Sequence, residues 1–191
     1  MKKTLFIIFA TLLIGCQSGN KKNNNKIKSD SLIKKQIIDS IPVFLEGFLY
    51  DNVDGGKFTF ETVKGKVLLL DFWSTRCRPC IKEHPEIVKL KKTINHENFQ
   101  VIAISTDRET ERWKKFIKEN HWQGINLNIN SFKPTTPLHK MIFKPLIRKG
   151  DTIYSATLPT YYLIDKELNV IKLDSINERN LETKINNLLK E

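Results

Sequence analysis

Two continuous apolar runs, each the length of a β-strand, constrain the fold of this 191-residue chain more than any other feature. The first run covers Val67–Trp73 and the second covers Phe99–Ser105. A strand that is apolar along its whole length is typical of a parallel sheet covered on both faces, whereas a strand with one wet face alternates. Between the runs, Ile87, Leu90 and Ile94 recur at helical spacing. The pattern therefore predicts a right-handed strand–helix–strand unit.

The segment before this unit predicts an extra pair of strands. Residues 58–63 alternate between apolar and polar side chains, as a half-buried strand does, and residues 54–56 supply a turn before them. Together with residues 43–49 they predict a β-hairpin at the N-terminal end of one α/β domain. We expect that domain to span residues 41–191, because the chain is too short for a second sizeable core.

The second half of the domain is expected to add two helices and two strands. Apolar spacing of three and four residues predicts the helices, and short apolar runs across a polar turn predict the strands. In chain order these elements are a helix around residues 113–117, strands at residues 161–164 and 170–173, and a helix over residues 181–189. Residues 124–157 contain three prolines, so we expect a loop there, with one helical turn near residues 138–143.

The amino-terminal residues have the layout of a bacterial export signal. Two lysines precede an apolar run at residues 4–15, which is short for crossing a bilayer core of about 30 Å. The run ends in Leu-Ile-Gly-Cys16, which resembles the bacterial lipobox. That resemblance implies removal of residues 1–15 as a lipoprotein signal peptide and diacylation of Cys16. An ordinary cleaved signal, with Cys16 as a free thiol, is the alternative.

Residues 16–40 are rich in Asn, Lys and Ser and predict a flexible tether. Two acyl chains on Cys16 supply the two signals that stable anchoring to a lipid bilayer needs. We therefore expect a bacterial cell-envelope protein, lipid-anchored to a membrane, whose domain faces the periplasm or the exterior, where disulfide chemistry proceeds. The net charge is +11, but no nucleic-acid-binding module accompanies it, so no nucleic-acid partner is expected.

The motif Cys77-Arg78-Pro79-Cys80 lies directly between the first apolar run and the predicted helix. Backbone N–H groups and the dipole at a helix N-terminus stabilise a thiolate, so we expect the pKa of Cys77 to lie below the free-thiol value of about 8.5. Arg76 and Arg78 add positive charge that acts in the same direction. Cys80, one turn into the helix, is expected to be the shielded thiol. The pattern predicts that Cys77 attacks a partner's disulfide and that Cys80 resolves the mixed disulfide.

Two carboxyl groups are candidates for the base that Cys80 needs. Asp71 lies within the first apolar run, six residues before Cys77, and strand alternation would point it beneath the motif. Burial there would raise its pKa toward neutrality, which suits proton transfer with Cys80. Glu83 is three residues past Cys80 and so on the same helical face. The alternatives are a hydrogen-bonded structural acid for Asp71 and a solvated helix residue for Glu83.

The residues from Asp71 to Cys80, followed by Pro85, resemble the active site of thioredoxins. Glu83 makes the segment more similar to the TlpA/ResA-like branch of membrane-tethered thiol-disulfide oxidoreductases. The resemblance covers residues 41–191 and implies a thioredoxin fold, with a central mixed sheet flanked by helices and an N-terminal β-hairpin extension. It also implies an enzyme without a cofactor that acts on protein thiols and disulfides of the cell envelope, in the reducing direction, with a membrane thiol reductant as donor.

Residues 158–160, Leu-Pro-Thr, match the cis-proline loop of this family, which lies against the Cys pair and helps to bind substrate backbone. The resemblance therefore implies a cis peptide before Pro159. It also implies a substrate-facing rim, to which we assign Pro159, Leu158, Trp73, Arg76, Arg78 and Pro79. Arg76 stands where the family often has an aromatic residue, so the identity of the protein partner is left open.

Metal and haem sites fit the sequence less well. A structural zinc site takes four ligands, and the chain has no second Cys-x-x-Cys and no closely spaced His pair, so no metal is expected. A copper chaperone would need other thiol spacing and a placed histidine, for which His139 is the candidate. Covalent haem attachment needs a histidine directly after the second cysteine, where this chain has Ile81.

Two other functions stay open beside thiol–disulfide exchange. A peroxiredoxin-like peroxidase has a threonine two residues before its reactive cysteine, as Thr75 stands before Cys77, but the proline expected further upstream is missing. A lipoprotein binding module would use the Cys77–Cys80 bridge only as a structural bond. Closing so short a loop removes little entropy from the unfolded chain, which makes the bridge a poor stabilising bond.

Overall fold

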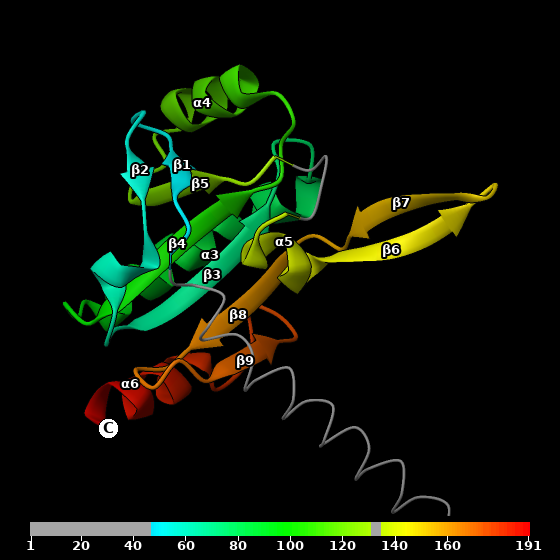
Figure 1. Ribbon diagram of the computed structural model, residues 1–191. Helices are drawn as coiled ribbons and strands as arrows, with labels where there is room; N and C mark the ends of the chain where they lie inside the picture. The colour runs from blue at the N-terminus through cyan, green and yellow to red at the C-terminus, as the bar shows by residue number, and fades with distance from the viewer. Residues whose placement is uncertain (1–46, 131–134) are drawn as a thin grey trace, which may run out of the picture. The chain divides into compact units, whose positions relative to one another are not determined.

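The computed structural model describes residues 47–130 and 135–191, and these residues form a seven-stranded mixed sheet and a separate two-stranded hairpin (Figure 1). The spatial order of the sheet is β2-β1-β5-β4-β3-β8-β9. Strands β3, β4 and β5 run parallel, and every other neighbouring pair runs antiparallel. In chain order its strands are β1 (Tyr50–Asn52), β2 (Lys57–Phe58), β3 (Val67–Trp73), β4 (Phe99–Ser105), β5 (Ile125–Asn128), β8 (Thr160–Ile164) and β9 (Val170–Leu173).

The two apolar runs form the centre of the sheet, with the bounds that the sequence predicts. Strand β3 is buried at all seven positions and pairs in parallel with β4, from Val67 opposite Phe99 to Trp73 opposite Ser105. Helix α3 (Arg78–Ile94) makes the crossover between them. It ends at Asn95, which takes the left-handed conformation and donates its N–H to the Lys91 carbonyl. The predicted strand–helix–strand unit is confirmed.

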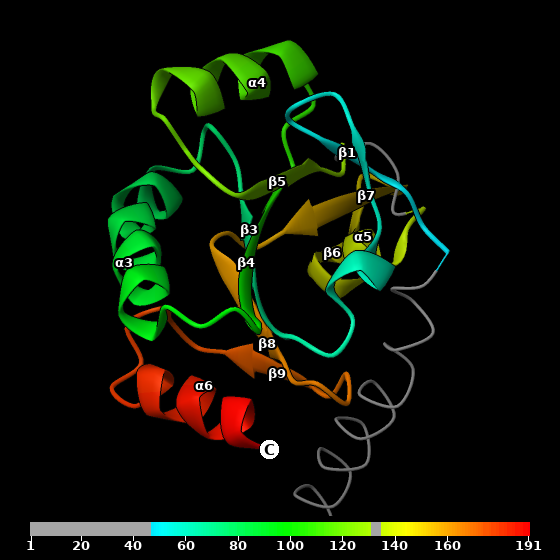
Figure 2. The same ribbon diagram turned by 90° about the vertical axis from the view of Figure 1, so that its left-hand side faces the viewer.

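Helices cover both faces of the sheet. Helices α3, α4 (Thr110–Glu119) and α6 (Leu181–Lys190) pack on the face that carries Val67, Leu69 and Trp73. A 3-10 turn, η1 (Phe60–Val63), and helix α5 (Pro137–Ile142) pack on the opposite face. Figure 2 shows α3 and α5 on opposite sides of the strands. The predicted mixed sheet flanked by helices is therefore confirmed.

The N-terminal hairpin is present, but its strands are shorter and shifted. Strands β1 and β2 pair antiparallel across residues 53–56, where Gly55 has a φ of 87° and Gly56 donates its N–H to the Asp54 carboxylate. Residues 60–63 form η1 and not the predicted continuation of a strand. Their buried side chains, Phe60 and Val63, are three apart and so fit a 3-10 turn, in which positions i and i+3 share a face.

The prediction of a loop across residues 124–157 was wrong. The segment contains strand β5, helix α5 and a hairpin of β6 (Phe143–Arg148) and β7 (Asp151–Ala156). Strand β5 was not predicted because two of its buried residues, Asn126 and Asn128, are polar, so the segment lacks the apolar pattern of a buried strand. Pro145 is tolerated in β6 because a two-stranded sheet has only edge strands. The helical turn predicted near residues 138–143 corresponds to α5.

The β6–β7 hairpin projects from the sheet and pairs with no other strand among the described residues (Figure 1). Its strands align from Phe143 opposite Ala156 to Arg148 opposite Asp151. Large apolar side chains on it are exposed, and Ile147 retains 69% of its accessible surface. Its C-terminal strand leads directly into the loop that carries Pro159.

The predicted signal peptide (1–15) and the whole predicted tether (16–40), including Cys16, lie outside the described residues. So do residues 41–46 of the predicted domain. Within residues 47–130 and 135–191, none of the helices is long and apolar enough to cross a membrane.

Candidate active site

The two cysteines lie at the point where β3 ends and α3 begins. Cys77 is the N-cap of α3, and its Sγ accepts the N–H of Cys80 at 3.2 Å. Pro79 occupies the first turn, where a missing N–H leaves no helical hydrogen bond unmade. Cys77 and Cys80 are joined in a disulfide, with Cα atoms 5.3 Å apart. The location predicted from the sequence is therefore confirmed.

The two sulfur positions differ in access to solvent. Cys77 is partly exposed, whereas Cys80 retains only 3% of its accessible surface and packs with Trp73 and Trp113. A partner thiol or disulfide can approach Cys77 directly, while Cys80 is reached only through Cys77. This asymmetry is the one expected of an attacking and a resolving cysteine.

The loop before Cys77 is secured by a residue that the sequence reasoning missed. The Asp107 carboxylate, buried just past the end of β4, accepts the Thr75 N–H at 2.8 Å and the Thr75 hydroxyl at 2.7 Å. It also accepts the Ser105 hydroxyl at 2.7 Å. Asn128 donates its side-chain amide to the Asp107 carbonyl. A polar residue at the carboxyl end of a parallel strand beside the motif was the available signal.

Asp71 lies beneath α3, as strand alternation predicts. Its neighbours on the same face of β3 are Leu69, which packs with Ile87 of α3, and Trp73, which packs with Cys80. Asp71 retains 3% of its accessible surface, and its Oδ1 accepts no hydrogen bond from the described residues. Burial, and secondarily the negative charge of Glu83, raises the pKa of Asp71 to about 7. The alternative of a structural acid satisfied by local hydrogen bonds is therefore disfavoured.

Glu83 does not extend freely into solvent. The Tyr161 hydroxyl donates to Glu83 Oε2 at 2.7 Å, across from β8 to α3. Tyr161 is also directly opposite Asp71 in the antiparallel pairing of β3 with β8. Burial, the charge of Asp71, and the hydrogen bond and charge of Glu83 raise the pKa of Tyr161 far above its usual range, so Tyr161 stays protonated. The sequence reasoning missed Tyr161, although its strand was recognised.

The loop with Pro159 lies at the same end of the sheet as the disulfide. Thr160 is paired with Phe72, which places Pro159 beside the end of β3 from which the Cys motif follows. The Leu158–Pro159 peptide is cis, as predicted. Leu158 packs against the cluster of Trp73 and Cys80, as Cys77 does, and both Leu158 and Pro159 are partly exposed.

The other residues assigned to the substrate-facing rim divide into two groups. Arg76, Arg78 and Pro79 are exposed beside Cys77. The Arg76 guanidinium is 2.9 Å from the Glu109 carboxylate, so its charge near the sulfur is partly compensated. Trp73 has no accessible surface, which corrects the expectation that it faces the substrate. As an odd-numbered residue of β3 it points under α3 and packs with Cys80.

An aromatic cluster that the sequence reasoning also missed supports the buried side of the disulfide. The Trp122 ring lies 4.1 Å from Trp73 and stacks on His84, with ring centroids 3.5 Å apart and planes 8° apart. Phe116 packs edge-on to Trp122. Burial lowers the pKa of His84 to about 4, so this ring is neutral at physiological pH.

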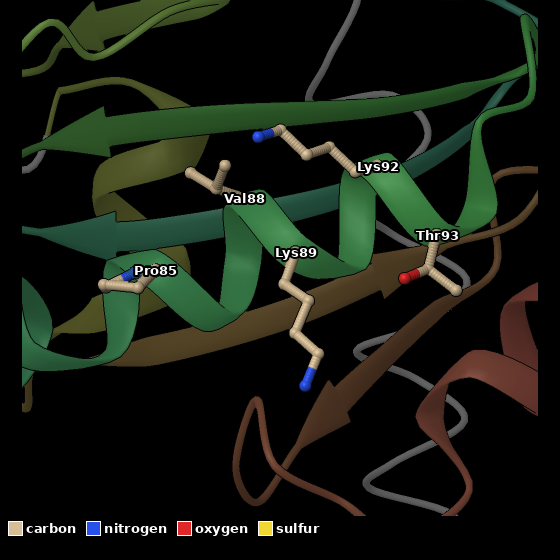
Figure 3. Close-up of a pocket in the computed structure, with 5 residues that line it drawn as sticks. All are labelled: Pro85, Val88, Lys89, Lys92 and Thr93. Atoms are coloured by element: carbon tan, nitrogen blue, oxygen red, sulfur yellow. The ribbon is translucent and has the colours of Figure 1, made fainter.

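No three Cys, His, Asp or Glu side chains within residues 47–130 and 135–191 gather as metal ligands would. His139 Nδ1 is 2.7 Å from Thr136 Oγ1 and His139 Nε2 is 2.8 Å from the Asn130 carbonyl oxygen. Its helix, α5, packs on the face of the sheet opposite to Cys80. A hollow of about 380 Å³ lies along the exposed side of α3, next to Pro85, Val88 and Lys92 (Figure 3). Its side chains splay apart and do not converge on a common point, so it forms no second site.

Curated relatives with matching sequence are named thiol-disulfide oxidoreductase ResA. One such protein from Bacillus cereus is 30% identical over 129 residues, which cover 65% of this chain and 64% of the relative. The Bacillus subtilis protein is 25% identical over 126 residues, which cover 66% of this chain and 62% of that one. The chain thus spans slightly less than two thirds of the length of these relatives.

Solved structures of similar fold include the thioredoxin domain of a thiol-disulfide oxidoreductase from Bacteroides vulgatus. It has a TM-score of 0.57 and 22% identity, over 73% of this chain and 91% of that chain. A thiol:disulfide interchange protein from Chlorobium tepidum gives 0.55 and 21%, over 75% of this chain and 90% of that chain. These likenesses establish the thioredoxin-like fold. The AhpC/TSA family model matches residues 41–173, more than half of the chain. The buried-strand, disulfide and cis-proline geometry described above therefore lies in a chain that belongs to the AhpC/TSA family, of thioredoxin-like fold.

Proposed function

We propose that this protein is a thiol-disulfide oxidoreductase that exchanges disulfides with protein substrates through Cys77 and Cys80. The observation that carries the proposal is the asymmetric disulfide at the start of α3, with one partly exposed and one buried cysteine. The names of the curated relatives support the same activity. We assign the reducing direction, because a carboxyl group that can accept the Cys80 proton favours attack by the reduced pair.

In the reduced protein the Cys77 thiolate attacks one sulfur of a partner's disulfide. A bond forms between Cys77 Sγ and that sulfur, and the other partner sulfur leaves and takes up a proton. Cys80 then loses its proton and attacks Cys77 Sγ, which releases the first partner sulfur as a thiol. The partner gains two electrons and two protons, and the Cys77–Cys80 disulfide observed in the structure is the oxidised product.

The surroundings of the two sulfurs match these steps. The Cys80 N–H, directed at Cys77 Sγ, stabilises negative charge on that atom together with the dipole of α3. Asp71, with its pKa near neutrality, accepts the proton of Cys80 when the mixed disulfide is resolved and returns it when the pair is reduced again. We assign Glu83 a supporting role through its charge. Leu158, Pro159, Arg76, Arg78 and Pro79 provide the partly exposed or exposed surface around Cys77 that contacts the partner.

The geometry favours this function over a peroxidase. In a peroxidase, Thr75 would assist at the reactive Cys77. Here Thr75 retains only 7% of its accessible surface, and its hydroxyl donates to Asp107 at 2.7 Å, so it is engaged in the loop anchor. The second thiol is adjacent and already paired with Cys77.

The proposal extends to cellular location. We propose that residues 1–15 direct export, that acylated Cys16 anchors the chain to the bilayer, and that the domain works in the cell envelope on protein thiols and disulfides. A membrane thiol reductant would then return the pair to the dithiol form. The lipobox-like end of the apolar run supports the anchoring.

The test is a Cys80→Ala variant expressed in its own cell envelope. It should accumulate mixed disulfides through Cys77, because the resolving thiol is gone and captured partners stay attached. The matched control is the Cys77→Ala, Cys80→Ala double variant, which should capture none. Non-reducing gels with mass spectrometry of the captured proteins provide the measurement. Absence of any captured partner, together with rapid oxidation of the Cys77 thiol by peroxide, would favour the peroxidase instead.

A further inference from the structure

Tyr161 links three elements that meet beneath the disulfide. It belongs to β8, lies directly opposite Asp71 of β3, and donates its hydroxyl to Glu83 of α3 at 2.7 Å. Tyr161 retains 2% of its accessible surface and packs with Leu69 and Ile87. Its side chain is therefore held in the core, with its hydroxyl directed at the Glu83 carboxylate.

The position of Glu83 depends on that hydrogen bond. Glu83 is three residues past Cys80, and its side chain is partly exposed, so without the Tyr161 hydroxyl it can turn outward to water. Among the described residues, no cation is found to hold the Glu83 carboxylate in place by an ion pair. The tyrosine is thus the contact that keeps this negative charge close to the sheet.

The charge of Glu83 matters because Asp71 senses it. The titratable groups placed against Asp71 are Glu83 from α3 and Tyr161 from β8, while the neighbouring position on β4 is Ala103. Cys80 packs with Trp73, the next residue on the same face of β3. Glu83 is the second cause of the raised pKa of Asp71, after burial. Ionisation of Asp71 beside a fixed negative charge is harder than beside one that has moved into solvent.

We propose that Tyr161 is a positioning residue, which holds Glu83 against the sheet and thereby sets the pH above which Cys80 resolves mixed disulfides. This role rests on the proposed function, since it concerns the proton that Cys80 gives up. Tyr161 itself exchanges no proton with the sulfurs, because its hydroxyl proton is committed to Glu83.

The test uses the reduced protein and the aromatic disulfide DTNB. Attack by Cys77 releases one thionitrobenzoate, and attack by Cys80 on the resulting mixed disulfide releases a second, so the two phases report the two cysteines separately. The rate of the second phase is measured from pH 5 to 9. In Tyr161→Phe its midpoint should move down by about 0.5 to 1 pH unit, because Asp71 ionises more readily once Glu83 turns away.

Tyr162→Phe is the matched control. Tyr162 is the next residue on β8, points to the opposite face, and donates its hydroxyl to the Met141 carbonyl at 2.9 Å. Its variant loses an equivalent hydroxyl and should keep the wild-type midpoint. Glu83→Gln should lower the midpoint as well, and adding Tyr161→Phe to Glu83→Gln should cause no further shift.

Three results would overturn the proposal: an unshifted or upward midpoint in Tyr161→Phe, an equal shift in Tyr162→Phe, or a full further shift in the Glu83→Gln background. Each would show that Tyr161 does not act by holding Glu83 in place. Failure of the proposed function has a different signature, namely the absence of a second thionitrobenzoate release from the wild-type protein.

Discussion

Asp71→Asn should make the oxidised protein more stable than the wild type at alkaline pH. In the folded protein the pKa of Asp71 is raised from 3.8 to about 7. The folded state therefore holds a proton that the unfolded chain has released throughout this range. The contribution of Asp71 to the free energy of unfolding is greatest below its ordinary pKa of 3.8 and is lost as the pH rises through about 7. Asparagine has nearly the same shape and never ionises, so the variant avoids this loss.

The size of the effect follows from the two pKa values. Their difference is about 3 units, and each unit corresponds to about 1.4 kcal/mol, so ionisation of Asp71 costs about 4 kcal/mol of folding free energy. Because Asp71 is almost fully buried, solvent screening removes little of it. Between pH 4 and pH 8.5 the free energy of unfolding of Asp71→Asn should rise by about this amount relative to the wild type.

Urea denaturation at half-unit pH intervals measures the difference. Both proteins are kept oxidised, so that the disulfide contributes equally to each. Glu83→Gln is a suitable control, since removing a neighbouring charge should weaken the pH dependence of the wild type without abolishing it. If the difference in free energy of unfolding between Asp71→Asn and the wild type stays constant from pH 4 to pH 8.5, the pKa of Asp71 is not raised. The assignment of Asp71 as the base of Cys80 would then fail as well.

Two further predictions concern the scaffold. Asp107→Ala removes the acceptor of the Thr75 N–H, the Thr75 hydroxyl and the Ser105 hydroxyl, so it should lower the free energy of unfolding, measured in urea, by about 3 kcal/mol. Asp107→Asn should lower it less. A loss below about 1 kcal/mol in Asp107→Ala would show that these hydrogen bonds do not hold the loop. Backbone amides of the β6–β7 hairpin should exchange with deuterium about 100-fold faster than those of β3, because an isolated two-stranded sheet is marginally stable. Exchange as slow as that of β3 would show that another surface covers the hairpin.

The centre of the fold was predictable because its signals are local and strong. A strand covered on both faces is mostly apolar on both faces, which is why β3 and β4 have the predicted bounds. The cysteines and Asp71 follow from the same strand, because alternation and the start of a helix set where their side chains point. The predicted cis peptide depended on the family resemblance, since local sequence alone gives X-Pro bonds a low cis frequency.

Other parts of the site were out of reach for physical reasons. Tyr161 meets Glu83 only because β8 pairs with β3 under α3, and the two residues are 78 positions apart in sequence. Asp107 meets Thr75 across 32 positions in the same way. The β6–β7 hairpin was missed because its apolar residues are exposed and Pro145 suggested a break. Contacts between distant segments leave no periodic trace in the chain.

The anchoring of the Thr75 loop by Asp107 has a consequence for the two oxidation states. The three hydrogen bonds that the Asp107 carboxylate accepts, from the Thr75 N–H, the Thr75 hydroxyl and the Ser105 hydroxyl, involve no sulfur atom. Opening the Cys77–Cys80 bond breaks none of these three hydrogen bonds, so the support that Asp107 gives to the Thr75 loop does not depend on the disulfide. We therefore expect the loop that leads into Cys77 to keep its shape in both oxidation states, so that a partner distinguishes the two forms at the cysteines and not at this loop.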